Sequence, residues 1–198
     1  DDDDPDPDHD DPTPLPSAPA MTGAVVVGRA ASPSRERGEN FHLVGDRGLA
    51  ASWKGRARDN VEAIRLAIEI DRDGRPATAA EQERLARFIG FGASDLANGV
   101  FRRPGEADFR KGWEEIGADL EGLVGEGDYA SLARCTQYAH FTPEMIVRVV
   151  WAGLERLGWR GGRVLEPGIG TGLFPALMPE TLRPLSHVTG VELDPVTA

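Results

Sequence analysis

The stretch Val164-Leu-Glu-Pro-Gly-Ile-Gly-Thr-Gly-Leu-Phe174 puts three alternate glycines directly after a short apolar run. Residues 163–166 predict a strand, and Gly168, Gly170 and Gly172 follow in the loop. A residue without a Cβ lets the backbone turn tightly and lie close against a bound nucleoside. The stretch therefore predicts a strand, a ligand-binding glycine loop and the start of a helix.

A second strand is predicted over residues 187–193, and a short helix over 173–178 lies in the connection to it. The intervening residues are too many for a hairpin and enough for a parallel crossover. Glu192, near the end of this strand, can accept hydrogen bonds from two ribose hydroxyls, and Asp194 is a second candidate just beyond. The expected fold class is α/β: a helical N-terminal region leads into the start of a Rossmann-like sheet, which is cut short at Ala198.

The spacing of the glycines separates this loop from a dinucleotide site. Dinucleotide-binding loops run G-x-G-x-x-G, so that the third glycine packs the helix on the strand and the pyrophosphate meets the helix N-terminus. Here the pattern is G-x-G-x-G, and Leu173 takes the sixth position. This pattern disfavours NAD and FAD, although a NAD-dependent dehydrogenase stays among the alternatives.

Helices are predicted upstream of the first strand, because apolar residues recur three and four positions apart. Gly74 should end the first helix. Thr78-Ala-Ala-Glu81 is a capping box that opens the second: the Thr hydroxyl accepts from the N3 amide, and the Glu side chain reaches back to the cap amide. The buried stripe expected for this second helix is Leu85, Phe88 and Ile89. The apolar runs that mark the helices are 61–70, 85–89, 113–123 and 129–134.

The helix with the strongest signals spans residues 142–157. Thr142 is the predicted N-cap, Pro143 occupies the tolerated first position, and Gly158 lies just past the end. Apolar residues at helical spacing predict one buried stripe along this helix. Its members are Ile146, Val149, Val150, Leu154 and Leu157.

Residues 1–20 differ in composition from the rest of the 198-residue chain. They carry eight Asp and no Lys or Arg, whereas the remainder has 25 acidic against 22 basic side chains, so most of the net charge of -11 lies in this tail. A nearly neutral body has no basic field to hold nucleic acid, so DNA contacts are expected from local patches or from other parts of a longer protein. The regions expected are a disordered acidic tail over 1–20, an irregular leader over 21–55, a helical accessory region over 56–138 and the beginning of a cofactor-binding domain over 139–198.

Cys135 is the only cysteine, which rules out an intramolecular disulfide and any thiolate-rich metal site. His140 has no second histidine at ligand spacing, so no metal is expected. No apolar run of about 18 residues occurs, and the acidic N-terminus lacks the pattern of a signal peptide. We expect a cytoplasmic protein without a membrane partner.

Three motifs carry a resemblance to a known family. Glu166-Pro-Gly-Ile-Gly-Thr-Gly-Leu-Phe174 and Gly190-Val-Glu-Leu-Asp-Pro195 resemble the first and second cofactor motifs of S-adenosylmethionine-dependent methyltransferases, above all those that methylate amino groups of DNA. Ala139-His-Phe-Thr-Pro143 resembles the motif that adenine-specific DNA methylases place before the glycine loop. Further stretches resemble the methylase segment of the very large helicase-methylase fusion proteins of bacterial plasmids and phages. They are residues 58–65, 74–82, 85–92 and 133–140.

This resemblance implies that the chain binds S-adenosylmethionine. Glu166 would accept from an amide or water near the methionine ammonium, the loop glycines would line the cofactor, and Glu192 would hold the ribose hydroxyls. Thr142 opens a helix whose free amides favour the cofactor carboxylate, while Phe141 and Phe174 would be walls of the site. The implied cofactor residues are Phe141, Thr142, Glu166, Pro167, Gly168, Gly170, Gly172, Phe174, Glu192 and Asp194.

No catalytic residue is assigned within the chain. The catalytic tetrapeptide of the family, Asn or Asp followed by Pro-Pro and an aromatic, is missing, and no Pro-Pro pair occurs. We therefore expect the N-terminal part of a DNA methyltransferase for the adenine amino group, inactive alone. Its expected partners are DNA, through missing C-terminal parts, and a covalently linked helicase domain of a larger mobile-element protein. The alternatives are a methyltransferase acting on RNA or protein, and a non-catalytic remnant or accessory module of a mobile element.

Overall fold

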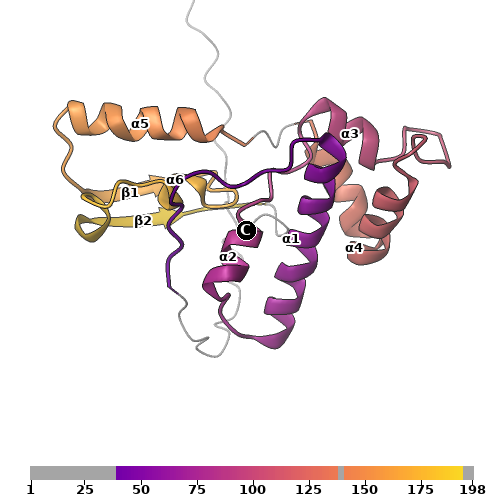
Figure 1. Cartoon of the computed structure of the whole chain (residues 1–198), viewed down its shortest axis with the longest axis horizontal. Helices are drawn as coiled ribbons and strands as arrows, with labels where there is room; N and C mark the ends of the chain where they lie inside the picture. Colours follow the sequence, from indigo (N-terminus) through magenta and orange to yellow (C-terminus); the bar gives the residue numbers. More distant parts are fainter. Residues whose placement is uncertain (1–38, 138–140, 194–198) are drawn as a thin grey trace, which may run out of the picture. The chain divides into compact units, whose positions relative to one another are not determined.

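The computed structural model describes residues 39–137 and 141–193, all within one compact unit that spans residues 35–198. In these ranges a series of helices precedes a small parallel sheet, so the chain has the α/β class that the sequence predicts (Figure 1). No helix in the described ranges is long and apolar enough to cross a membrane. The expected acidic tail, His140 and Asp194 lie outside the described residues.

Helix α1 spans Trp53–Asp73 and begins three residues before the predicted helical region. Ser52 caps it, because its side-chain oxygen accepts a hydrogen bond from the amide of Gly55 at 3.1 Å. At the other end Gly74 adopts a left-handed φ of 65°, and the predicted end of the helix is confirmed. The buried residues of α1 are Ala57, Asn60, Val61, Ala63, Ile64 and Leu66.

Helix α2 spans Ala79–Leu85 and has the predicted capping box. The hydroxyl of Thr78 accepts from the amide of Glu81 at 3.3 Å, and the Glu81 carboxylate accepts from the amide of Thr78 at 2.8 Å. The predicted stripe does not lie along this helix, because the helix ends at Leu85, but Leu85 and Ile89 are partly buried against the apolar cluster around α1. Phe88 is buried beyond the helix end, where it joins the apolar cluster around α1.

Helices α3 and α4 complete the helical part. Helix α3 spans Ser94–Val100, and the sequence does not indicate it, because it is short and lacks a side-chain cap. Helix α4 spans Glu114–Cys135 but breaks at Gly125, whose φ of 79° and ψ of 168° are not helical. The two helices predicted at 113–123 and 129–134 are the two arms of α4. Helices α1, α3 and α4 pack together around one apolar cluster.

The sheet follows the helical part and consists of two parallel strands. Val164 pairs with Val188 in its centre, and the predicted parallel crossover is confirmed. The second strand ends at Gly190 rather than at Leu193, because the chain beyond Gly190 turns toward the glycine loop. The elements in chain order are β1 (Gly162–Glu166), α6 (Leu173–Ala176), the 3-10 helix η1 (Arg183–Leu185) and β2 (Ser186–Gly190).

Helix α5 spans Glu144–Arg156 and precedes β1. Its N-cap is Pro143, whose carbonyl accepts the first helical hydrogen bonds from the amides of Ile146 and Val147. Thr142 stands one residue too early, so the predicted N-cap is wrong, and no side chain caps this helix. The helix therefore begins without the capping energy that a hydroxyl would supply.

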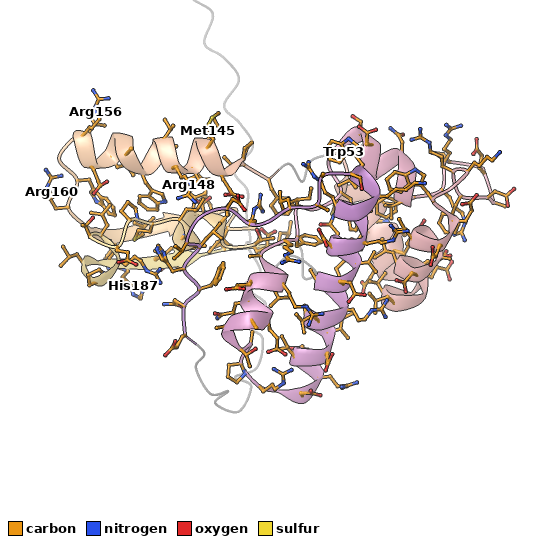
Figure 2. The ribbon with its side chains drawn as sticks, in the orientation of Figure 1. Trp53, Met145, Arg148, Arg156, Arg160 and His187 are labelled. Carbon is orange, nitrogen blue, oxygen red and sulfur yellow. The ribbon has the colours of Figure 1, made fainter. Side chains whose placement is uncertain are left out.

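The buried face of α5 is rotated from the predicted stripe. Val147 and Trp151 are buried, and the indole Nε1 of Trp151 donates to the carbonyl of Phe174 at 2.9 Å. This hydrogen bond directs Trp151 toward α6, so the opposite side of the helix is left outside, as the projecting side chain of Met145 shows (Figure 2). The predicted stripe is exposed at Ile146, Val149, Val150 and Leu157 and half-buried at Leu154.

Candidate functional site

The glycine loop leaves the carboxyl end of β1 and is held against the chain that leaves β2. The amide of Ile169 donates to the carbonyl of Val191 at 3.0 Å. Gly170 and Gly172 have left-handed φ values of 52° and 74°, which other residues rarely adopt, so both glycines are needed for this turn. Gly168 has open space around its Cα and no left-handed φ, and the fold alone gives no reason for glycine there.

Glu192 joins the end of the second strand to this loop. Its Oε2 atom accepts a hydrogen bond from the amide of Gly170 at 2.8 Å, and its Oε1 atom accepts from the amide of Leu193 at the same distance. The side chain is half-buried. An acid that the sequence assigned to the site by its position at a strand end is therefore in direct contact with the glycine loop.

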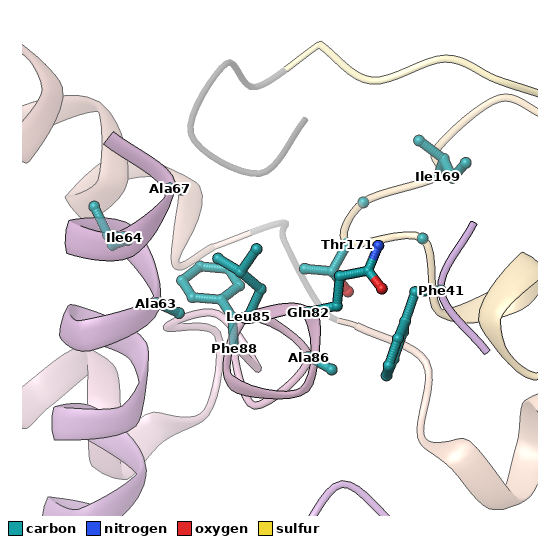
Figure 3. A pocket seen from close by; sticks show the side chains of 12 residues that line it. Phe41, Ala63, Ile64, Ala67, Gln82, Leu85, Ala86, Phe88, Ile169 and Thr171 are labelled. Carbon is teal, nitrogen blue, oxygen red and sulfur yellow. The ribbon is translucent and has the colours of Figure 1, made fainter. Parts of the chain in front are cut away.

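The loop forms one wall of a cleft of about 430 Å³, whose other walls come from α1 and α2 (Figure 3). Ala63 and Ile64 contribute from α1, and Leu85 contributes from the end of α2. Small-molecule sites of this kind are concave and mostly apolar, with a few placed polar groups. The helical region and the glycine loop, predicted as separate regions, together build this cleft.

The cleft contains no ionisable side chain among the residues that line it. Its polar groups are the amide of Gln82, the hydroxyl of Thr171 and the backbone of the glycine loop. Gln82 Nε2 donates to the carbonyl of Glu39 at 2.7 Å, which fixes the side-chain amide and leaves its carbonyl oxygen able to accept from a ligand. Such a lining suits binding and provides no general acid or base.

Of the twelve residues that line the cleft, only Gly170 and Gly172 were predicted as site residues, and Gln82 and Phe41 are among those that sequence reasoning missed. Both lie far from the glycine loop in the chain. Phe41 belongs to no quoted motif, and the resemblance of residues 74–82 assigned Gln82 no role in the site. Gln82 occupies the position directly after the capping-box Glu, where an exposed polar residue is the usual expectation. Only the packing of α2 beside the loop makes it part of the cleft.

Phe141 lies beside the loop but is not one of the residues that line the cleft. Its ring is wedged between two glycines: a Cβ built on Gly90 would lie 2.2 Å from Cε2, and a Cβ built on Gly170 would lie 2.7 Å from Cε1. The ring also meets that of Phe88 edge-on at a centroid distance of 5.9 Å. Phe141 is thus packed against protein atoms where a cofactor contact was expected.

The remaining predicted residues are not gathered in this cleft. Glu166 and Phe174 line a separate cleft of about 260 Å³ that also includes Trp151 and Trp159. Pro167 is exposed and Thr142 is half-buried, and neither lines the cleft beside the glycine loop. Of the predicted residues, Gly170 and Gly172 line the cleft, and Glu192 does not line it but contacts the loop through the amide of Gly170.

The titratable groups with displaced pKa values lie elsewhere. A hydrogen bond from Arg75 is the main cause that lowers the pKa of Glu81, one from Arg102 lowers the pKa of Glu121, and burial raises the pKa of Tyr129. These groups belong to pairs within the helical region. No cluster of three or more potential metal ligands occurs in the described part of the chain.

Comparison with family models, curated proteins and solved structures found no match to this chain. The interpretation of the cleft therefore depends on its sequence motifs and its geometry.

Proposed function

We propose that the cleft binds S-adenosylmethionine and that the chain is the N-terminal, cofactor-binding part of a methyltransferase for the adenine amino group of DNA. The observation that carries the proposal is the 2.8 Å hydrogen bond from the Gly170 amide to Glu192 Oε2. It joins the acid after the second strand to the glycine loop after the first. In open α/β sheets, ligands bind beyond the carboxyl ends of the parallel strands, which is where this pair lies.

The carboxylate of Glu192 is held beside the glycine loop by the hydrogen bonds that it accepts from the amides of Gly170 and Leu193. An acid at the end of the second strand of such a sheet is the residue type that holds the hydroxyls of a ribose. In the proposed role Glu192 orients the nucleoside part of the cofactor while Gly170 lets the backbone approach it closely.

The cleft suits the proposed cofactor in size and character. Its volume of about 430 Å³ falls in the range typical of small-molecule sites, roughly 300 to 1,000 Å³. Its apolar walls, including Phe41 and Leu85, suit an adenine ring. When bound, the cofactor supplies a methyl group on a sulfonium, and the residues here would hold it in place. A finer assignment of the fold as Rossmann-like is part of the same proposal.

A dinucleotide fits less well. Leu173 stands where the third glycine of a dinucleotide loop would lie, and it is a buried residue that opens α6. That helix has only four residues, so it offers little of the aligned dipole that favours a pyrophosphate. These two features support a nucleoside ligand without a pyrophosphate.

The choice of DNA adenine as acceptor rests on the resemblance of the three motifs to amino-methylating DNA enzymes. Such chemistry requires the base to be flipped out of the duplex. The tetrapeptide that would hold the amine does not occur in this sequence, so binding of the cofactor is the role proposed for these residues. DNA and a linked helicase are proposed partners of the larger protein.

Isothermal titration of the 198-residue protein with S-adenosylmethionine and S-adenosylhomocysteine tests the proposal. We expect saturable binding below about 1 mM, and about a tenfold loss in Glu192→Gln, since a charge-assisted acceptor is lost. Glu180→Gln is the matched control, because that carboxylate is 81% exposed and is paired with His42, whereas Glu192 accepts from the glycine loop. The proposal would be contradicted if the protein bound NADH in preference to S-adenosylmethionine, or if it bound neither S-adenosylmethionine nor S-adenosylhomocysteine.

A further inference from the structure

Asn60 is the one fully buried polar side chain of the described core, and it holds the turn that follows α2. Its Oδ1 atom accepts from the amide of Ile89 at 2.9 Å, and its Nδ2 atom donates to the carbonyl of Gly90 at 2.6 Å. The oxygen and the nitrogen of the side-chain amide are thus both hydrogen-bonded, to the backbones of two successive residues. A buried amide that bonds in this way fixes the backbone of the turn relative to α1, since leaving either partner unpaired is costly.

The turn that Asn60 holds is shaped to receive an aromatic ring. Gly90 has a left-handed φ of 69°, and a Cβ at this position would lie 2.2 Å from Cε2 of Phe141. Two carbon atoms that are not bonded to each other cannot lie this close, and the ring also packs against that of Phe88 in an edge-to-face arrangement. The position of Gly90 therefore determines where the ring of Phe141 can lie.

The same ring touches the glycine loop. A Cβ on Gly170 would lie 2.7 Å from Cε1 of Phe141, so the ring is in close contact with the backbone of this loop residue. The amide of Gly170 is the donor to Glu192. A continuous set of contacts thus runs from α1 through the turn and the ring to the loop.

We infer that Phe141 is a positioning residue through which the helical region sets the conformation of the glycine loop. Its ring transmits the position of the turn at Gly90 to Gly170 without touching the ligand. The inference deepens the proposed function, because the loop is the one proposed to hold the cofactor. Coupling of this kind is reciprocal, so a ligand in the cleft should also protect the turn held by Asn60.

Hydrogen exchange of the ligand-free protein tests the coupling directly. The reporters are the loop amides of Ile169, Gly170 and Gly172, which are all hydrogen-bonded. In Phe141→Leu we expect these amides to exchange about tenfold faster than in the wild-type protein, because the loop loses the ring that supports it. Equal exchange in the two proteins would overturn the inference.

Phe101→Leu is the matched control for loss of stability. Phe101 is 5% exposed and belongs to the same apolar cluster, but it packs against Phe91 and Tyr129. This variant should lower overall stability and leave the ratio of loop exchange to global exchange unchanged. If both variants accelerate the loop amides equally, Phe141 is an ordinary core residue and the inference fails.

A second variant acts from a distance. Asn60→Ser removes both hydrogen bonds to the turn and makes no contact with the loop, yet it should also accelerate exchange at Gly170. Should circular dichroism show that this variant does not fold, the pair Phe141→Leu and Phe101→Leu decides the question alone.

Titration with S-adenosylhomocysteine separates the inference from the proposed function. We expect Phe141→Leu to weaken binding about tenfold and Phe101→Leu to leave it within about twofold. If the wild-type protein binds no S-adenosylhomocysteine, the proposed function fails, and the exchange experiment still decides whether the ring couples the turn to the loop. If the ligand binds equally to both variants and exchange is unchanged, the coupling fails while the proposed function stands.

Discussion

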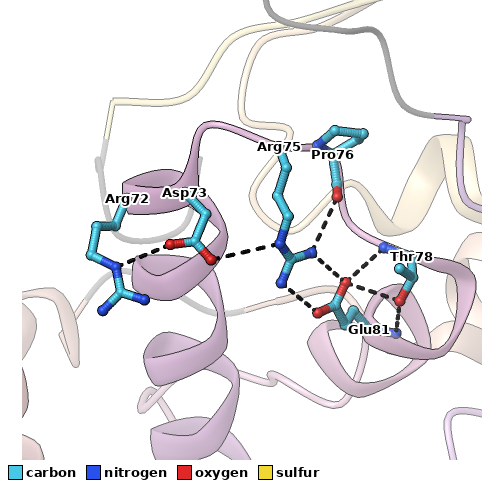
Figure 4. Close-up of polar contacts among 6 residues, drawn as sticks. All are labelled: Arg72, Asp73, Arg75, Pro76, Thr78 and Glu81. Atoms are coloured by element: carbon cyan, nitrogen blue, oxygen red, sulfur yellow. Dashed lines mark hydrogen bonds and ion pairs between the residues drawn. The ribbon is translucent and has the colours of Figure 1, made fainter.

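Arg75 and Glu81 face each other through two parallel hydrogen bonds of 2.8 Å, one from Nη1 to Oε2 and one from Nη2 to Oε1 (Figure 4). The same carboxylate accepts from the amide and the hydroxyl of Thr78 at 2.8 and 2.9 Å. These donors, Arg75 foremost, lower the pKa of Glu81 from its usual 4.5 to about 2. The hydrogen bonds of the capping box of α2 are thereby extended to Arg75, two residues beyond the end of α1, and they depend on a charged carboxylate.

A lowered carboxyl pKa makes stability depend on pH in a defined direction. The contribution of Glu81 is fully present above its unfolded pKa near 4.5 and is lost as the pH falls through about 2. We expect Glu81→Gln to have a lower urea midpoint than the wild-type protein at pH 6, and the gap to close between pH 4.5 and 2. Glu83→Gln, on the exposed side of the same helix, should show no such gap. A difference that stays constant over this range would contradict the role of the charge.

The rotated face of α5 predicts opposite results for two neighbouring valines. Val147 is fully buried, and Val147→Ala should cost about 2 kcal/mol in the free energy of unfolding through the lost methyl groups and the cavity. Val149 is 63% exposed, so Val149→Ala should change stability by less than about 0.5 kcal/mol. Urea denaturation of both variants measures the difference. Equal costs, or a larger cost at Val149, would restore the stripe predicted from the sequence.

Local chemistry explains what the sequence predicted correctly in this fold. The capping box at Thr78 and the left-handed end at Gly74 depend on residues within one or two turns, and both are as expected. The parallel crossover follows from the length and composition between two short apolar runs. Helix α5 shows the limit, because its apolar residues surround much of its circumference. Its buried side is the one that packs Val147 and Trp151 in the apolar cluster that includes α6, where Trp151 also donates to the carbonyl of Phe174.

In the candidate site too, some contacts could be predicted from the sequence and others could not. Gly170, Gly172 and Glu192 belong to motifs that lie at strand ends, and their meeting could be predicted from the parallel topology. Phe141 was predicted as a wall of the cofactor site, and in the structure its ring packs against two glycines. One of these, Gly90, comes from the helical region, where nothing in its local sequence indicates a contact with the loop. Tertiary packing creates that contact.

Trp151 offers a test of the hydrogen bond that orients α5. Trp151→Phe removes the donor to the carbonyl of Phe174 in a site that is 4% exposed, so we expect a loss of about 1 to 2 kcal/mol. Trp53→Phe is the control, because Trp53 is 38% exposed and contacts Arg56 through its ring face, which phenylalanine keeps. That variant should stay within about 0.5 kcal/mol of the wild-type protein. The comparison is made by urea unfolding monitored by circular dichroism, and similar losses at both positions would exclude an orienting role for the indole.

Two glycines with similar left-handed φ values allow two effects of an added Cβ to be measured separately. One effect is the backbone strain of a left-handed residue, and the other is the overlap with the ring of Phe141. Gly74 and Gly90 have φ values of 65° and 69°, but a Cβ at Gly74 would meet nothing within 4 Å, whereas one at Gly90 would overlap the ring of Phe141. Gly74→Ala should therefore cost only the left-handed strain, about 1 kcal/mol.

Gly90→Ala should cost about 2 kcal/mol more, because the added methyl group must displace the ring from a packed site. In a double-mutant cycle Phe141→Leu should recover part of this additional cost, since a smaller side chain leaves room for the Cβ. The three variants and the double variant are compared by urea denaturation. If Gly74→Ala and Gly90→Ala cost the same, the ring of Phe141 is not seated on Gly90, and the contact that links the helical region to the glycine loop is absent in solution.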